Sequence, residues 1–224
     1  MMKEATSHSS HGTPVKILLG ILRTDFVGLF EVIAPYIPKV FHRREGIYEV
    51  LDYDAQLTLN DSKGKLATFT KRQRVRFLQH NVIAYQDQAW GDGEIFADYR
   101  CAPGIAVDRY REGHKFRVLI SLRETKNRND VEDFYIERVV KGGFSKTTED
   151  FQIEIDHPTH NLSMAIIFPR KRPPRQVKLI EQHAQRTHEL DSEQIQQLPD
   201  RRWQVRWESH RLKLYEAYIL RWEW

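Results

Sequence analysis

A short segment of the sequence, QDQAWGDGE at residues 86–94, combines an aromatic side chain with several carboxylates. Trp90 follows Asp87 and precedes Asp92 and Glu94. The face of an indole ring attracts cations, and a ring beside carboxylates suits cationic or sugar ligands. The glycines form no phosphate-binding loop, because the GxxxxGK[ST] pattern is absent; a tight turn or β-bulge also uses glycine. We therefore treat Asp87, Trp90, Asp92 and Glu94 as a candidate ligand site, with a plain turn as the alternative.

Two basic segments are candidates for contact with nucleic acid. The arginines of KRQRVRF (71–77) alternate along a predicted strand and so share one face, and PRKRPPR (169–175) is a proline-rich basic loop. The candidate contacts are Arg72, Arg74, Arg76, Arg170, Lys171, Arg172 and Arg175. Basic grooves with aromatic side chains follow a phosphate backbone. However, the 31 acidic residues nearly offset the 35 basic ones, for a net charge of +4, and charged strand faces also protect sheet edges. Nucleic-acid binding is the less favoured interpretation.

No motif for catalysis or metal binding stands out. A zinc site needs three or four converging ligands, and the spacing of the ten histidines specifies none. His188-Glu-Leu lacks the second histidine of HExxH, and GxSxG is absent. The single cysteine, Cys101, excludes an intramolecular disulfide and has no thiol-protease context. We expect no metal, no cofactor and no catalytic residue.

The N-terminal region divides into two parts. Residues 1–12 are polar and predict a disordered tail, whereas residues 13–45 predict an amphipathic, largely apolar helical segment that begins at Thr13-Pro14. Charged residues within the apolar run argue against a membrane-spanning helix. The candidate contact residues are Ile17, Leu18, Ile21, Leu22, Phe26, Leu29 and Phe30. This segment either packs against the rest of the protein or binds a partner or a membrane surface.

From residue 46 onward the sequence predicts a β domain. Phe151, Ile153 and Ile155 alternate with polar residues, which is the period of a half-buried strand. LSMAIIF (162–168) is apolar on both faces, as expected for a strand buried between two layers. We expect eight to ten strands, with one short helix possible in residues 189–199. The sequence shows no regular alternation of strands and helices, which is the pattern that would predict a parallel sheet. The expected fold is mainly β: an antiparallel β-sandwich of immunoglobulin-like or C2-like layering over residues 46–224.

These observations favour a binding role over catalysis. We expect a non-enzymatic β-sandwich recognition or adaptor domain that binds another protein. The alternatives are a membrane-associating effector that uses the N-terminal helix, and a small-ligand sensor or an enzyme of unrecognised type that uses the Trp90–Asp92 region. With no visible secretory signal and one cysteine, we expect the protein in the cytoplasm. A fold of this kind hosts many functions and assigns none by itself.

Overall fold

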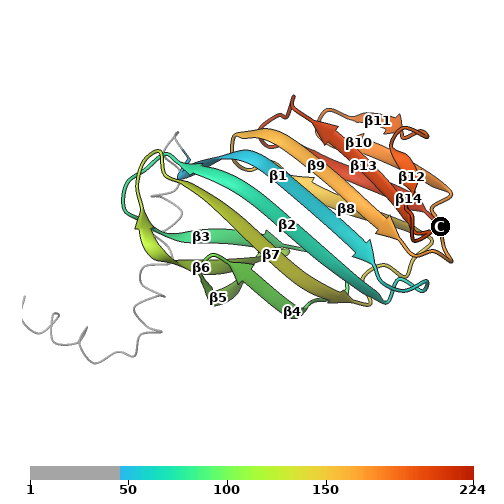
Figure 1. Cartoon of the computed structure of the whole chain (residues 1–224), viewed down its shortest axis with the longest axis horizontal. Helices are drawn as coiled ribbons and strands as arrows, with labels where there is room; N and C mark the ends of the chain where they lie inside the picture. The colour runs from blue at the N-terminus through green and yellow to red at the C-terminus, as the bar shows by residue number, and fades with distance from the viewer. Residues whose placement is uncertain (1–45) are drawn as a thin grey trace, which may run out of the picture. The chain divides into compact units, whose positions relative to one another are not determined.

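The computed structural model describes residues 46–224, which form β-strands joined by turns and loops and contain no helix (Figure 1). The strands are β1 (Tyr48–Leu59), β2 (Leu66–Phe77), β3 (Val82–Ala89), β4 (Glu94–Ala102), β5 (Ile105–Glu112), β6 (Lys115–Lys126), β7 (Val131–Lys141), β8 (Thr148–Glu154), β9 (Thr159–Phe168), β10 (Gln176–Glu181), β11 (Arg186–Glu189), β12 (Ile195–Gln197), β13 (Trp203–Ser209) and β14 (Ala217–Glu223). The prediction of a mainly β protein is confirmed. The predicted tail and helical segment, with all seven apolar contact residues from Ile17 to Phe30, lie outside the described residues.

The strands form three sheets. Their orders are β12-β13-β9-β1-β2-β7-β4, β11-β10-β14-β8 and β3-β6-β5. The antiparallel arrangement expected from the sequence is found at every pair except β1 with β9, which run parallel. Alternating hydrophobicity indicates which face of a strand is buried but not which distant strand lies beside it.

Two details of the strand pattern also differ from expectation. There are more than the eight to ten strands expected, because several are short edge strands such as β11 and β12. The short helix expected within residues 189–199 is not formed. Gln194 N and Ile195 N both donate to Asp191 O, at 3.2 and 3.0 Å, which closes a single turn, and the chain then enters β12.

One face of the seven-stranded sheet is covered by both smaller sheets. On β2, Ala67 and Phe69 belong to a buried cluster shared with β8, β10 and β14 of the four-stranded sheet. Farther along the same face, Val75 and Phe77 belong to a second cluster shared with β3 and β6 of the three-stranded sheet. The two smaller sheets therefore cover neighbouring regions of one large sheet, and the predicted alternation within residues 71–77 is confirmed.

A buried polar network lies between these clusters, which we call the seam. On β2, Lys71 and Gln73 occupy the inner face between Phe69 and Val75. Lys71 Nζ lies 2.7 Å from Asp87 Oδ1, and both side chains are buried. Tyr99 donates to the second oxygen of Asp87 at 3.1 Å. Burial is the largest single influence on the pKa of Lys71 and lowers it, but the charge and hydrogen bond of Asp87, together with Tyr53 and Tyr48, raise the pKa enough that the net shift is upward.

The C-terminal strand lies inside a sheet. β14 pairs with β10 on one side and with β8 on the other. Trp222 is fully buried, and its ring lies 5.7 Å from Phe168 and 6.1 Å from Trp224. The final residues are therefore part of the larger core, which explains why so many aromatic residues gather at this end of the sequence.

Candidate binding cleft

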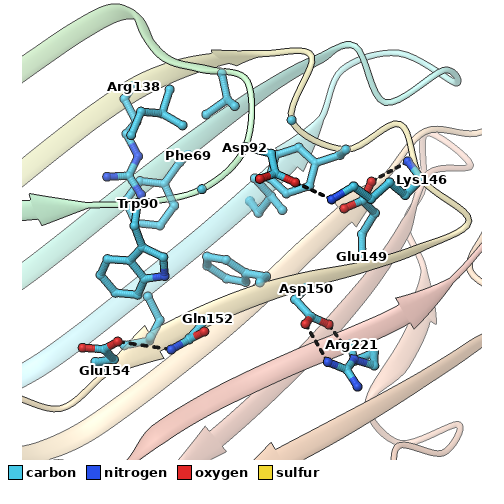
Figure 2. A pocket seen from close by; sticks show the side chains of 18 of the residues that line it. Phe69, Trp90, Asp92, Arg138, Lys146, Glu149, Asp150, Gln152, Glu154 and Arg221 are labelled. Atoms are coloured by element: carbon cyan, nitrogen blue, oxygen red, sulfur yellow. Dashed lines mark hydrogen bonds and ion pairs between the residues drawn. The ribbon is translucent and has the colours of Figure 1, made fainter. Parts of the chain in front are cut away.

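A cleft of about 380 Å³ opens beside the seam, over the inner face of the seven-stranded sheet (Figure 2). Side chains of β1, β2 and β7 form its floor. One wall is β8, the edge strand of the four-stranded sheet, and the other is the end of β3 with the loop that follows. The floor residues are Tyr53, Leu57, Phe69, Arg138 and Val140. The cleft therefore exists because the two smaller sheets do not meet over the large one.

The loop after β3 carries Trp90 and Asp92 into the cleft. Gly93 makes this loop possible, because it has a φ of +76° and a Cβ there would lie 2.3 Å from the carbonyl oxygen of Lys141. Lys146 pairs with Asp92 at one end of the cleft. At the other end, the ammonium group of Lys115 lies 5.0 Å from the centre of the Trp90 ring. Both of the loop residues predicted from the sequence therefore line the wall.

Most charged groups around the cleft already have partners. Lys115 pairs with Glu154, and Arg221 binds Asp150 through two hydrogen bonds of 2.7 and 2.8 Å. Glu149 is buried, and its carboxylate accepts a hydrogen bond from Lys146 N at 2.5 Å. Burial raises the pKa of Glu149. These pairs hold the walls in place and leave little net charge at the rim.

Arg138 is the exception among the cations that line the cleft. Its guanidinium lies 4.1 Å from the centre of the Phe69 ring. Its Nη1 donates a long hydrogen bond of 3.4 Å to the carbonyl oxygen of Gln88, while its Nε is buried without a partner. Within residues 46–224 it forms no ion pair, and burial lowers its pKa. A guanidinium with unused donors therefore lies on the floor of the cleft.

The backbone of β8 adds a second feature. Among the described strands, β8 pairs only with β14. Ile155 N donates to Glu216 O at 2.9 Å and Trp224 N donates to Thr147 O at 3.1 Å, so the odd-numbered residues bond toward β14. In an antiparallel ladder the alternate residues direct their N–H and C=O groups to the other side. The backbone groups of Thr148, Asp150, Gln152 and Glu154 therefore point to the free edge, and all four residues line the cleft.

The structure separates the four residues of the predicted ligand site. Trp90 and Asp92 line the cleft, but Asp87 is fully buried in the ion pair with Lys71. Glu94 begins β4 opposite Lys141 and does not line the cleft. Asp87 lies within the strand and faces inward, whereas Trp90 lies just beyond the strand end, which explains why neighbours in sequence face different surroundings.

The structure also keeps the two basic segments apart. Arg72 and Arg74 are exposed on the outer face of β2, opposite Asp54 and Asp52 of β1, and Arg76 pairs with Glu49 at 3.1 Å. The second segment supplies Arg170, Lys171, Arg172 and Arg175. Arg172 donates to Ser62 O in the turn before β2, and its guanidinium lies 3.8 Å from the Trp224 ring centre. At about 3.3 Å per residue, the arginines on β2 begin roughly 20 Å from that turn. The two segments form no common groove.

Sequence reasoning missed Arg138 and the edge of β8. A lone arginine in ERVV has no distinctive neighbours, and an edge strand shows the same alternation as an inner one. The one available signal was that Arg138 follows Phe134 and Ile136 on the apolar face of its strand. An arginine at a position where the pattern calls for an apolar residue marks a buried charge with a specific role.

Two classes of feature are not found in the described part of the chain. No group of three or more histidine, cysteine or acidic side chains in residues 46–224 is arranged to hold a metal ion. In the same residues there is no helix long and apolar enough to cross a membrane.

Comparison with known proteins identifies no family. No family model and no curated protein match this sequence. Among solved structures, the crystal structure of Legionella pneumophila aminopeptidase A in complex with aspartic acid is similar at 11% identity and a TM-score of 0.46. The match covers 80% of this chain but 22% of that one, so this chain spans about a fifth of the length of the aminopeptidase. A likeness this distant assigns no activity.

Proposed function

We propose that this protein is a non-enzymatic recognition domain that binds another protein, and that an extended segment of the partner lies along the free edge of β8. The observation that carries the proposal is that, within residues 46–224, the outer edge of β8 has no strand beside it and faces a cleft. Addition of a strand to an exposed sheet edge is a common way of binding peptides: backbone hydrogen bonds supply affinity and pockets select alternate side chains.

The surroundings of β8 support this mode of binding. A strand placed beside it meets the N–H and C=O groups of Asp150 and Gln152. Alternate side chains of that strand then point toward the floor, where Tyr53 and Phe69 provide an apolar surface. Natural proteins usually cover or disrupt long edges of this kind because such edges recruit other chains. The edge of β8 instead lines a cleft, and we interpret this as the position at which one specific strand of the partner pairs with it.

A peptide selection followed by hydrogen exchange tests the proposal. Random twelve-residue peptides displayed on phage are selected against the purified full chain, and bound peptides are resynthesised. We expect them to slow amide exchange at Asp150 and Gln152, whose N–H groups point to the free edge. Failure to select any peptide, or protection confined to other strands, would count against the proposal.

A pair of variants at one position separates backbone from side-chain recognition. Gln152→Pro removes the N–H that points to the free edge, and proline is tolerated on edge strands at such positions. Gln152→Ala removes the side chain and keeps the N–H. We expect the proline variant to lose peptide binding while the alanine variant keeps it, with circular dichroism showing both folded. Equal behaviour of the two folded variants would show that β8 does not pair with the peptide.

A small-ligand sensor is the second candidate, because Trp90 and Asp92 line the same cleft. An aromatic ring with nearby polar groups is a common feature of small-molecule sites. Trp90→Ala distinguishes the two functions: it removes the main aromatic wall for a small ligand but leaves the edge of β8 unchanged.

We also propose that the scaffold is a β-sandwich of the immunoglobulin-like or C2-like type. In support, each buried cluster combines side chains of the seven-stranded sheet with those of one smaller sheet. An experimental structure that placed the sheets face to face, about 10 Å apart, would agree with it.

A further inference from the structure

We propose that Arg138 is the anchor of the cleft and binds a carboxylate group of the ligand. This inference rests on the proposed function in one respect: the carboxylate is assigned to an Asp or Glu side chain of the bound segment. The binding site itself is inferred from the residues around Arg138.

The first argument is the state of the Arg138 donors. A guanidinium carries five N–H donors, and in this structure one of them makes a 3.4 Å hydrogen bond. The Nε donor is buried with no hydrogen-bond partner among residues 46–224. A buried polar group left unpaired lowers the stability of the folded protein, so a buried donor without a partner calls for an explanation.

The second argument is that the nearby carboxylates are already engaged. Asp87 is the acidic group whose charge most affects Arg138, but its two oxygens bind Lys71 and Tyr99. Among the acids that line the cleft, Asp150 binds Arg221 through both oxygens and Glu154 pairs with Lys115. Arg138 is therefore not neutralised by the described residues, and an incoming anion has a cation available on the floor.

The third argument concerns the kind of anion. The flat face of the guanidinium is occupied by Phe69, so its edge is left for a ligand. That edge matches a planar carboxylate through two parallel hydrogen bonds. A phosphate carries more charge and would meet stronger repulsion from Glu149, the one acid lining the cleft that forms no ion pair within residues 46–224. A singly charged carboxylate fits these surroundings better.

The geometry also links Arg138 to β8. Arg138 lies on the floor while β8 forms a wall, and both belong to one cleft (Figure 2). A strand added to β8 directs every second side chain toward the floor. One acidic residue in that strand can then reach the guanidinium while its backbone pairs with β8.

The first experimental arm uses acetate as the probe and the Arg138 Nε–H signal in ¹⁵N NMR as the readout. We expect acetate to shift this signal saturably, whereas chloride at the same ionic strength does not. Arg138→Gln is expected to abolish the saturable shifts of the amides around the cleft. Arg221→Gln is the matched control, because Arg221 lines the same cleft but is already bound to Asp150. Absence of a saturable shift, or unchanged shifts in the Arg138→Gln variant, overturns the inference.

The second arm uses the peptides selected against the full chain. We expect an Asp or Glu at a fixed position in them, and replacing it with Ala should weaken binding at least tenfold. The same replacement should have little effect in the Arg138→Gln variant, because the two groups act as one pair. Acetate binding without any peptide binding would support the carboxylate site at Arg138 and refute the proposed function. Peptides that bind along β8 without an acidic residue would keep the proposed function and refute this inference.

Discussion

Replacement of Asp87 by Asn tests whether the seam is structural, because the side chain keeps its shape and loses its charge. Asp87 is fully buried, and its Oδ1 lies 2.7 Å from Lys71 Nζ. The variant leaves the Lys71 ammonium without an anion, 5.3 Å from the centre of the Tyr85 ring. Removing one partner of a buried ion pair destabilises a protein by about 3–5 kcal/mol. We expect that loss at pH 6, measured by urea unfolding, and a fall in Tm of roughly 6–20 °C for a domain of this size.

The pH dependence provides an independent check on the same variant. In the native protein burial alone would lower the pKa of Lys71, but the charge and hydrogen bond of Asp87, with the nearby Tyr53 and Tyr48, together keep that pKa above its usual value. That contribution to stability is present below the pKa of an unfolded lysine, about 10.4, and is lost at higher pH. Without Asp87, burial should lower the Lys71 pKa below that of the unfolded chain. Stability of the variant should then rise with pH, by at most about 1.4 kcal/mol per pH unit, until the unfolded lysine also loses its proton.

Two further results decide how the variant is interpreted. The double variant Lys71→Met with Asp87→Leu removes both charges, and we expect it to recover most of the lost stability. An Asp87→Asn variant that is less than about 1 kcal/mol less stable than the native protein, with no pH dependence, would refute the structural role of the pair. Asp87 would then be available for a ligand, as its position in the sequence beside Trp90 suggested.

Three other predictions concern stability. Glu216→Gln should be about 1–3 kcal/mol less stable than the native protein at pH 7. Burial alone would raise the pKa of Glu216, but three backbone N–H groups hold it below its usual value. In urea unfolding the difference should therefore shrink as the pH falls below the pKa of an unfolded glutamate, about 4.3, and disappear once the native carboxylate also gains its proton. Deletion of Arg221–Trp224 removes two buried tryptophans, each worth about 3–5 kcal/mol, and should abolish the folded circular dichroism signal. Gly64→Ala should unfold at lower urea than Gly113→Ala, although both glycines have a positive φ, because a Cβ at Gly64 would lie 1.6 Å from the carbonyl oxygen of Phe144 and one at Gly113 meets nothing within 4 Å; equal midpoints would contradict this.

Strand faces could be predicted from the sequence because alternation depends only on neighbouring residues. The segment 151–155 shows this: Phe151, Ile153 and Ile155 are buried and the residues between them are not. The largely apolar segment 162–168 likewise forms most of β9, an inner strand of the largest sheet. In each case the local pattern reports burial on one or both faces.

The arrangement of the sheets could not be predicted in the same way. The parallel pairing of β1 with β9 joins residues about a hundred positions apart, such as Val50 and Thr159. Turn residues predict hairpins between neighbouring strands, but no local sequence pattern predicts a pairing between strands so far apart in the sequence. For the same reason the sequence did not reveal that β8 ends its sheet, since an edge strand and an inner strand can carry the same alternation.

The cleft and the buried ion pair have one structural origin, which explains why only half of the predicted ligand site lines the cleft. Where the two smaller sheets approach each other, the inner face of the large sheet carries three polar side chains, Lys71, Gln73 and Arg138, among its apolar ones. Close to β3 the gap is closed, and Lys71 finds its partner in Asp87. Toward β8 the gap stays open, and Arg138 is left with unused donors. The sequence places Asp87 and Trp90 three residues apart, but the end of β3 separates them: Asp87 is buried in an ion pair with Lys71, whereas Trp90 lines the cleft.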